Sequence, residues 1–315
     1  MIEILERFAS NPLDIMLDSL VLGLFQAGPL VLAAIGFTLI YYLNGFINVA
    51  YGETVTLGAY AAVTFNAILG FNLYVSIVPA ALLAGVLSVL TYLLIFRPAM
   101  RRGVGPTEMI ILSVGVSFLI RFMLRVGEIP FDILGLRLSD FELFGIALYN
   151  FSTGPLVNAQ ILGIVVSETK LVSLALAAAF TMGLYLFIFR TDYGARMRAL
   201  AGNLELAQVS GIDPVRVSVL IWFIAGVAGG LAGIFLGVFS FVNSDIGWNL
   251  ILIVIMVSVV GGTGNVRGAL VAGISAGILT AFITQLTQPF YAQIALLLFF
   301  IAVLKVNHLR TMARA

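Results

Sequence analysis

The sequence predicts an all-α integral membrane protein, a polytopic helical bundle with about nine transmembrane helices. Of its 315 residues, 61% are hydrophobic and only 10% are charged, and the mean hydropathy is +1.13. Soluble domains carry about 25% charged residues, so a soluble fold could not cover its surface with so few charges. Apolar stretches of about 20 residues, the length that crosses a bilayer as a helix, recur along the chain. Lys and Arg gather in alternate connecting segments, as they do in the cytoplasmic loops of membrane proteins.

The composition also excludes several classes of function. A net charge of +1 argues against a nucleic-acid surface, which needs a strong basic excess. The absence of cysteine excludes disulfides and thiolate metal sites. The single histidine, His308, leaves no basis for a histidine metal centre or a catalytic triad. The acidic start of the chain lacks the basic region of a signal peptide, so the first apolar segment is interpreted as a retained membrane helix.

The predicted helices form one transmembrane domain, 1–315. The segments at 247–262 and 289–305 are short, and 49–69 begins with polar residues, so the count could be eight or ten. The polar start of 49–69 also indicates a broken early helix. The predicted segments are 18–43, 49–69, 73–96, 107–126, 170–190, 215–240, 247–262, 268–286 and 289–305.

The basic residues orient this bundle. They concentrate after the third, fifth, seventh and ninth segments, always on one side, which predicts a cytoplasmic C-terminus. Nine crossings then place the N-terminus outside, although one miscounted helix reverses that inference. The acidic 127–169 loop is expected outside. Its length favours a small ordered external cap, with a short strand or interfacial helix at 144–151, over a simple linker.

The segment 191–214 does not resemble a simple connector. Met197, Leu200, Leu204 and Ala207 or Gln208 recur at helical spacing, which predicts a short amphipathic helix. Gly211 is expected to end that helix and Asp213-Pro214 to begin the next one. Such a helix could insert into a groove on a soluble partner or lie among lipid headgroups, and spacing alone favours neither.

Ordered motifs in this segment decide between the two. The pattern T-x-x-G-x-x-x-R-A, followed by N-x-x-x-A-x-x-x-G-I, resembles the cytoplasmic loop of ATP-binding-cassette importer permeases, specifically the LivH branch of branched-chain amino acid permeases. Glu205-Leu-Ala207 with Gly211 is similar to a shortened form of the importer pattern E-A-A-x-x-x-G. The resemblance implies a coupling helix that docks on an ATPase subunit. The residues assigned to coupling are Gly194, Arg196, Arg198, Asn203, Glu205, Ala207 and Gly211.

The resemblance extends over most of the chain. Residues 36–60 are similar to the family's G-x-T-L-I-Y…I-N-F-A-H-G-E…L-G-A-Y, 223–233 to its glycine-rich helix, and 261–269 to its G-G-x-G-x-x-x-G-A. Departures from the pattern put the cargo in doubt. Tyr51 stands where the family has histidine, Ile253 where it often has lysine, and Thr280 where it has glutamate. The family's R-P-x-G ending is missing, and the charged Glu108 and Arg121 occupy positions that are usually uncharged.

The resemblance implies a transport subunit, not an enzyme. Its partners would be ABC ATPase subunits that bind ATP and Mg²⁺, a second homologous (LivM-like) permease chain, and an external or periplasmic substrate-binding protein. The implied location is the bacterial or archaeal inner (plasma) membrane. The implied cargo is branched-chain or other neutral amino acids, with urea, short amides or another small polar solute as the alternative. The chain itself needs no cofactor, because its 261–268 glycine segment is no P-loop and is interpreted as a tight turn.

A few polar residues are candidates for the translocation pathway. Asn48, Tyr51, Glu53 and Thr54 are expected to line the helix break, because freed backbone groups there need polar partners. Alternatively, Glu53 caps a helix start and pairs with Arg121 or with a backbone amide. Arg121 is expected to snorkel to the interface, or else to contact substrate at a gate.

Two other functions remain as alternatives. A stand-alone secondary transporter or channel would show paired ionisable residues in mid-membrane, for which only Glu53 and Arg121 are candidates. That alternative leaves the coupling-like segment unexplained. An intramembrane enzyme lacks a suitable set of catalytic or metal-binding side chains.

Overall fold

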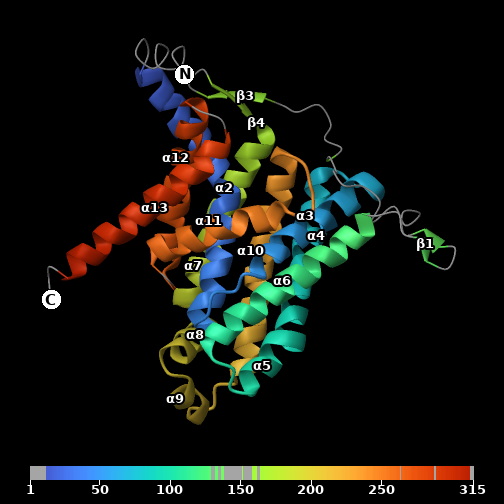
Figure 1. Cartoon of the computed structure of the whole chain (residues 1–315), viewed down its shortest axis with the longest axis vertical. Helices are drawn as coiled ribbons and strands as arrows, with labels where there is room; N and C mark the ends of the chain where they lie inside the picture. Colours follow the sequence, from blue (N-terminus) through green and yellow to red (C-terminus); the bar gives the residue numbers. More distant parts are fainter. Residues whose placement is uncertain are drawn as a thin grey trace.

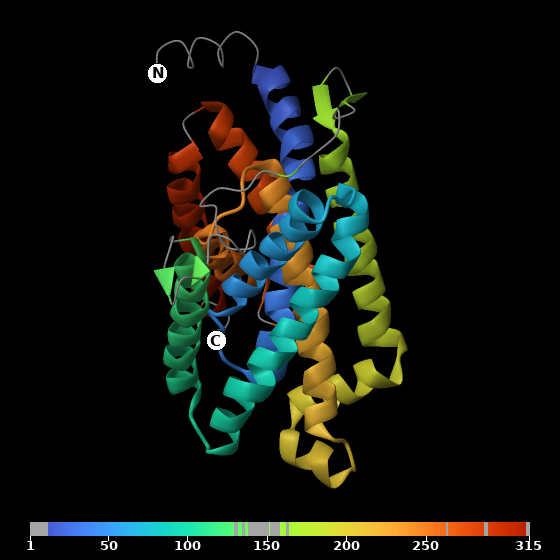
Figure 2. The ribbon, with the colours of Figure 1, turned by 90° about the vertical axis from the view of Figure 1, so that its right-hand side faces the viewer.

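The computed structural model of the chain is a bundle of helices (Figures 1 and 2). The structure describes residues 12–128, 132–133, 136–137, 151, 158–161, 164–262, 264–286 and 289–312. Each of the nine predicted apolar segments is helical, which confirms the predicted fold class. The N-terminal residues before Pro12 and most of the predicted cap, including all of 144–151 except Phe151, lie outside the described residues.

The first half of the bundle is built from long helices interrupted by short irregular turns. The span Leu73–Arg101 is continuous but passes through a π-helical turn before α5. The elements are α2 (Pro12–Asn44), α3 (Tyr51–Val63) with the π-helical η1 (Thr64–Ile68), α4 (Leu73–Thr91), the π-helical η2 (Tyr92–Phe96), α5 (Arg97–Arg101) and α6 (Pro106–Glu128).

The second half begins with the longest connection and contains the short helices of the predicted coupling segment. Two small antiparallel hairpins lie in the connection, β1 (Asp132–Ile133) with β2 (Leu136–Arg137) and β3 (Asn158–Ile161) with β4 (Ile164–Ser167). The helices are α7 (Glu168–Arg190), α8 (Asp192–Gly202), α9 (Leu204–Val209), α10 (Pro214–Phe239), α11 (Ile246–Gly261), α12 (Val266–Leu286) and α13 (Pro289–Met312).

Six described helices are long and apolar enough to cross a membrane. α11 and the apolar part of α13, Tyr291–Val303, have fewer than 18 residues, as the sequence suggested for these segments. α3 has 13 residues before its π-helical turn. It follows a non-helical stretch, 45–50, in which Gly45 adopts a φ of +70°. The predicted early helix break therefore lies between α2 and α3.

α2 is the central helix of the bundle. It packs against α7, α10, α11 and α12, and residues from Ala27 to Ile40 are almost entirely buried. α10 lies beside it and contacts both α3 and α4. Much of the outer surface of the surrounding helices is apolar and exposed, which is the arrangement expected of helices whose outer faces contact lipid rather than water.

Glycines let α10 approach its neighbours closely. A Cβ added to Gly58 of α3 would lie 2.3 Å from the Cα of Gly230, and a Cβ on Gly233 would lie 1.9 Å from the carbonyl oxygen of Val55. Small residues at such crossings allow backbones to pack by van der Waals contact, which is the main attraction between helices in lipid. The glycine stripe of α10 is thus a packing surface.

The two ends of the bundle carry different structures. α5, α8 and α9 lie together at one end, whereas α2 begins at the opposite end beside β3 and β4 (Figures 1 and 2). The end that holds α8 and α9 also carries most of the arginines of the predicted cytoplasmic side. These are Arg97, Arg101, Arg102, Arg190, Arg196, Arg198 and Arg216.

We predict that Gly233→Ala lowers the thermal unfolding temperature of the purified protein. The new methyl group would collide with backbone, and overpacking of this kind typically costs about 1–3 kcal/mol. Gly183→Ala on α7 is the matched control, because nothing lies within 4 Å of its added Cβ. Alanine is the better helix former, so the control should be neutral or slightly stabilised. Equal unfolding temperatures for the two variants would contradict this packing role.

Candidate functional site

The segment after α7 folds as two short helices rather than the single one predicted. The break is at Asn203, whose backbone is extended (φ −155°, ψ 107°). Its side-chain Oδ1 accepts a 2.9 Å hydrogen bond from the Leu206 amide and so caps α9. The prediction of one continuous amphipathic helix is wrong because this cap satisfies the start of a second helix. The predicted ends are confirmed: Gly211 has φ +82°, and Asp213 caps α10, which begins at Pro214.

Side-chain and backbone contacts attach α8 firmly to the end of α7. The Thr191 hydroxyl donates to the Phe187 carbonyl at 2.6 Å and accepts from the Gly194 amide at 3.1 Å. A Cβ on Gly194 would lie 2.3 Å from the Ile188 carbonyl oxygen, so only glycine fits there. The Arg198 guanidinium donates to that same carbonyl. These contacts join α8 to the last turn of α7.

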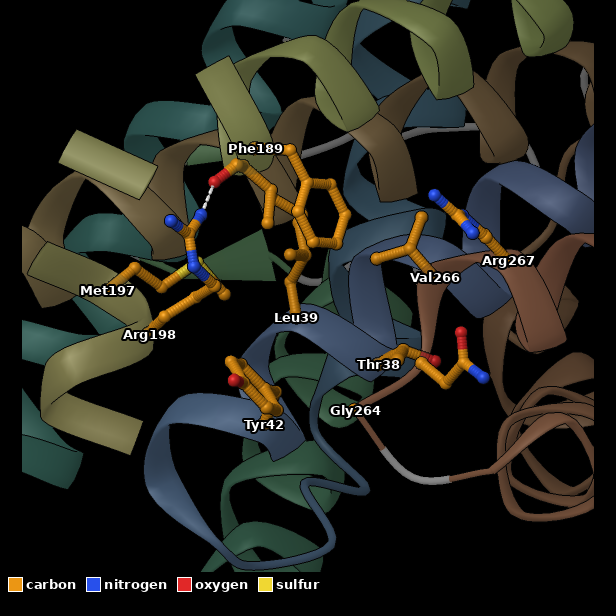
Figure 3. Close-up of a pocket in the computed structure, with 11 residues that line it drawn as sticks. Thr38, Leu39, Tyr42, Phe189, Met197, Arg198, Gly264, Val266 and Arg267 are labelled. Carbon is orange, nitrogen blue, oxygen red and sulfur yellow. Dashed lines mark hydrogen bonds between the residues drawn. The ribbon is translucent and has the colours of Figure 1, made fainter. Parts of the chain in front are cut away.

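A cavity of about 370 Å³ lies where α8 meets the membrane helices (Figure 3). The guanidiniums of Arg198 and Arg267 lie over the same ring, that of Phe189, at 5.5 and 5.7 Å from its centroid. The cavity lies between α8, the last turns of α2 and α7, and the start of α12. Its lining residues are Thr38, Leu39, Tyr42, Ile188, Phe189, Met197, Arg198, Gly264, Asn265, Val266 and Arg267.

α9 presents an apolar surface to the outside of the bundle. Leu206 and Val209 are 65% and 87% exposed, and Leu204 is 52% exposed. The sequence placed Leu204 on the same apolar stripe as Met197 and Leu200. The break at Asn203 rotates α9 relative to α8, so Met197 and Leu200 are buried and Leu204 is not. Large apolar side chains this exposed at the arginine-rich end of the bundle are typical of an interaction surface.

The second candidate region is a buried group of charges beside the helix break. Glu53 of α3 has no exposed surface. Its Oε1 accepts hydrogen bonds from the Ser117 hydroxyl at 2.7 Å and from Arg121 Nε at 3.4 Å, both on α6. Thr56 donates to Oε2 at 3.4 Å. A buried carboxylate is thus met by a cation and two hydroxyls, which is what a charge in this environment requires.

Arg121 extends the group of charges to α11. Its guanidinium carbon lies 3.8 Å from the centroid of the Trp248 ring, and its Nη1 is 3.9 Å from Asp245 Oδ1. Arg125 also pairs with Asp245 and donates to the Ser244 hydroxyl. The two carboxylates and two guanidiniums have no net formal charge. They connect α3, α6 and the start of α11.

Backbone contacts support the same junction. The Gly247 amide donates to Thr56 Oγ1 at 3.1 Å, and the Val49 amide at the break donates to Ser113 Oγ at 3.0 Å. The hydroxyl of Tyr51 donates to the carbonyl of Ala225 on α10 at 3.2 Å. Side chains of neighbouring helices therefore satisfy backbone groups around the break, as the hydrocarbon environment demands.

Comparison with known proteins identifies the class of membrane protein. The model of the family described as branched-chain amino acid transport system / permease component matches residues 19–304. The chain belongs to this permease family. Both the coupling-like segment and the buried charges lie inside the matched range. The chain is therefore a multi-pass membrane permease component, and ATPase activity belongs to other subunits of such systems.

Individual relatives cover most of the permease. It is 28% identical over 258 residues to a probable branched-chain amino acid transport permease protein LivH of Methanocaldococcus jannaschii, covering 81% of this chain and 77% of the relative. It is 27% identical to the high-affinity permease protein BraD of Pseudomonas aeruginosa, covering 84% and 85% of the two chains. It is 27% identical to LivH of Escherichia coli K12, covering 90% and 91%. No solved structure matches the permease with significance.

The permease structure separates the predicted coupling residues into two groups. Arg196, Asn203, Glu205 and Gly211 are exposed, whereas Gly194 and Ala207 are buried and Arg198 is half-buried. The exposed residues are available to a partner, and the others hold α8 and α9 against the bundle. The sequence missed Leu206 and Val209, although their apolar character in a polar loop was a usable signal.

The predicted pathway residues do lie together around the break. Asn48, Tyr51, Glu53 and Thr54 are buried in residues 48–54, and Arg121 reaches them from α6. The pairing of Glu53 with Arg121 is confirmed. Snorkelling of Arg121 is wrong, because the side chain is only 7% exposed and points inward to the carboxylate. Ser117, Trp248 and Asp245 were missed.

We predict that Arg121→Gln strongly destabilises the permease. It would leave Glu53 buried without its cation, and breaking a buried pair typically costs about 3–5 kcal/mol. Adding Glu53→Gln to the same chain should recover most of that loss. Unfolding free energies of the four proteins in a double-mutant cycle measure the coupling. Arg125→Gln is the control, because its 42% exposed side chain should contribute about 0–1 kcal/mol. Additive effects of the Glu53 and Arg121 substitutions would contradict the pairing.

Proposed function

We propose that this permease forms half of the membrane pathway of an ATP-binding-cassette importer for branched-chain or other neutral amino acids. A second, homologous permease chain supplies the other half, and an external binding protein delivers the substrate. The whole chain, 1–315, acts as one transmembrane domain. Family membership over residues 19–304 and the permease names of the relatives support this proposal.

The single observation that carries the proposal is the construction of α8 and α9. They are helices outside the membrane bundle, fixed to α7 through Thr191, Gly194 and Arg198, and they present Leu206 and Val209 outward. An amphipathic surface of this kind fits a groove on a soluble partner. ATPase subunits that close on binding ATP would move these helices, and the movement would pass to α7 and α2.

The same segment supports an orientation for the bundle. We assign the end with α5, α8 and α9, which includes segment 191–214, to the cytoplasm because arginines gather there. We assign the C-terminus to the same side because Lys305, Arg310 and Arg314 lie near it in the sequence. The 127–169 loop then faces the binding protein in the inner (plasma) membrane of a bacterium or archaeon. A labelling reagent that cannot cross the membrane should therefore reach a cysteine introduced at Ser167 but not one at Val209 in intact cells.

The buried charges at the helix break supply a second part of the mechanism. Glu53 and Arg121 connect α3 to α6, and Asp245 connects both to α11. Alternating access requires two arrangements of the helices, and substrate is released because its affinity differs between them. We propose that these residues, with Asn48, Tyr51 and Thr54, border the translocation pathway and that their pairing changes during transport.

We predict that Val209→Asp reduces substrate-stimulated ATP hydrolysis by the assembled transporter at least tenfold while leaving membrane insertion intact. The substitution places a charge in the middle of the proposed apolar contact, where burial without a partner is costly. Thr107→Asp is the control, because it puts the same charge on an exposed residue at the same end of the bundle but outside α8 and α9. Hydrolysis rates in vesicles, with and without the substrate-loaded binding protein, measure the effect. Normal stimulation of ATP hydrolysis in Val209→Asp would contradict the proposal that α9 contacts the ATPase.

We also predict that Gly211→Pro uncouples transport from ATP hydrolysis. Proline cannot adopt the φ of +82° found there, so the turn from α9 into α10 would be rebuilt. Gly211→Asn is the matched control, since asparagine tolerates the left-handed conformation. Uptake of labelled amino acid into vesicles should be lost in the first variant and largely kept in the second. Equal uptake by the two variants would show that the geometry of this turn is unimportant.

The competing proposals are separated by two measurements. Ligand binding by the cognate external protein distinguishes amino acids from urea, short amides or another small polar solute. Uptake driven by an ion gradient in vesicles that contain this chain alone would instead identify a stand-alone secondary transporter or channel.

A further inference from the structure

A second cavity separates α8 and α9 from the ends of the membrane helices. Its volume is about 530 Å³. It is bordered by the last residues of α2, by η2 and α5, by α8 and α9, and by the first turns of α10. The lining residues are Leu43, Asn44, Tyr92, Arg97, Met100, Arg101, Leu200, Leu204, Gln208, Pro214, Val215 and Ser218. The cavity does not share a residue with the one shown in Figure 3.

Two of the polar groups around this cavity are hydrogen-bond donors that lack acceptors. Arg97 Nε and Asn44 Nδ2 are both buried, and neither has a hydrogen-bond partner in the described part of the chain. Arg101, one turn along α5 from Arg97, adds a second guanidinium. None of the described lining residues is acidic, so the two positive charges face the cavity without a carboxylate. Buried donors without acceptors are rare in folded proteins and call for an explanation.

We propose that this cavity binds a phosphate-type oxyanion. A phosphate group has several acceptor oxygens in a tetrahedral arrangement, and guanidinium groups bind it through charge-assisted hydrogen bonds. Arg97 Nε and the Asn44 amide are the buried donors, and Arg101 is the exposed one at the rim. The group comes either from free inorganic phosphate or from the headgroup of an anionic phospholipid. Basic pockets between membrane helices are known binding places for such headgroups.

The position of the site gives the anion a specific effect. Arg97 and Arg101 belong to α5, whereas Leu204 and Gln208 belong to α9 and Leu200 to α8. An anion bound to α5 would therefore fill the cavity between α5 and the two helices α8 and α9. It would stabilise the position of the two helices relative to the bundle. Binding itself does not depend on the proposed transport function, so the two can fail separately.

The test uses the full chain reconstituted in lipid nanodiscs. One arm adds inorganic phosphate to phosphatidylcholine nanodiscs, and the other uses nanodiscs with one-fifth phosphatidylglycerol in phosphate-free buffer. Calorimetric titration measures phosphate affinity in the first arm, and native mass spectrometry counts retained phosphatidylglycerol in the second. Binding in either arm is the expected result, and the arm that responds identifies the source of the phosphate group.

Matched variants assign that binding to the cavity. Arg97→Gln should weaken binding roughly ten- to a hundredfold, as expected for losing a hydrogen bond to a charged group. Arg102→Gln removes the same charge from the same turn but does not line the cavity, so it should bind like the unmodified chain. Arg97→Lys should show intermediate affinity, because lysine keeps the charge but loses the planar fork. If Arg97→Gln does not fold, Arg97→Lys and Arg101→Gln provide the comparison.

Three results would overturn the proposal. The first is no saturable binding in either arm. The second is an equal loss of affinity in Arg97→Gln and Arg102→Gln, which would indicate general attraction to a basic surface. The third is that the chain is stabilised only when ATPase subunits are added, and that Arg97→Gln abolishes this stabilisation. That result would show that an acidic side chain of the ATPase fills the cavity.

Discussion

No water is available inside a hydrocarbon layer to compensate an unpaired charge or peptide group, and this constraint governs the permease. The sharpest case is Glu53, a fully buried carboxylate next to a break in the helical backbone. Arg121 and Ser117 reach it from α6, and Asp245, at the start of α11, pairs with both Arg121 and Arg125. Three helices are thereby held at the place where the chain departs from regular structure.

The same constraint determines how the helices pack. Apolar side chains gain little by leaving lipid for one another, so close van der Waals contact must supply much of the attraction. Glycines on α3 and α10 bring backbones together at Gly58 and Gly230. The tight core formed by α2, α3 and α10 then provides a fixed frame. The less buried α6, α7 and α11 pack around that frame.

The helices outside the bundle depend on this frame in a different way. α8 is held by groups of α7, which include the Ile188 carbonyl and the Phe189 ring. α9 is held mainly through Ala207, while a cavity separates much of it from α5. One helix is therefore tightly fixed, and the next borders a cavity beside which two buried donors, Arg97 Nε and Asn44 Nδ2, lack acceptors. Such a pair can respond to a partner on its outer face and to an anion on its inner face.

The sequence by itself determined the class of protein, because so few charges and repeated apolar segments exclude a soluble fold. Local rules also determined the turn at Gly211 and the start of α10 at Asp213-Pro214, since these depend only on neighbouring residues. The sequence could suggest that Glu53 pairs with Arg121, the nearest membrane candidate of opposite sign. The break at Asn203 is local as well, since it follows from a cap on the amide of Leu206 three residues further on. Only the tertiary structure decided that Arg121 turns inward and that Asp245 joins the pair. Each of these depends on which helices become neighbours, and residues more than sixty positions apart meet only once the bundle has packed.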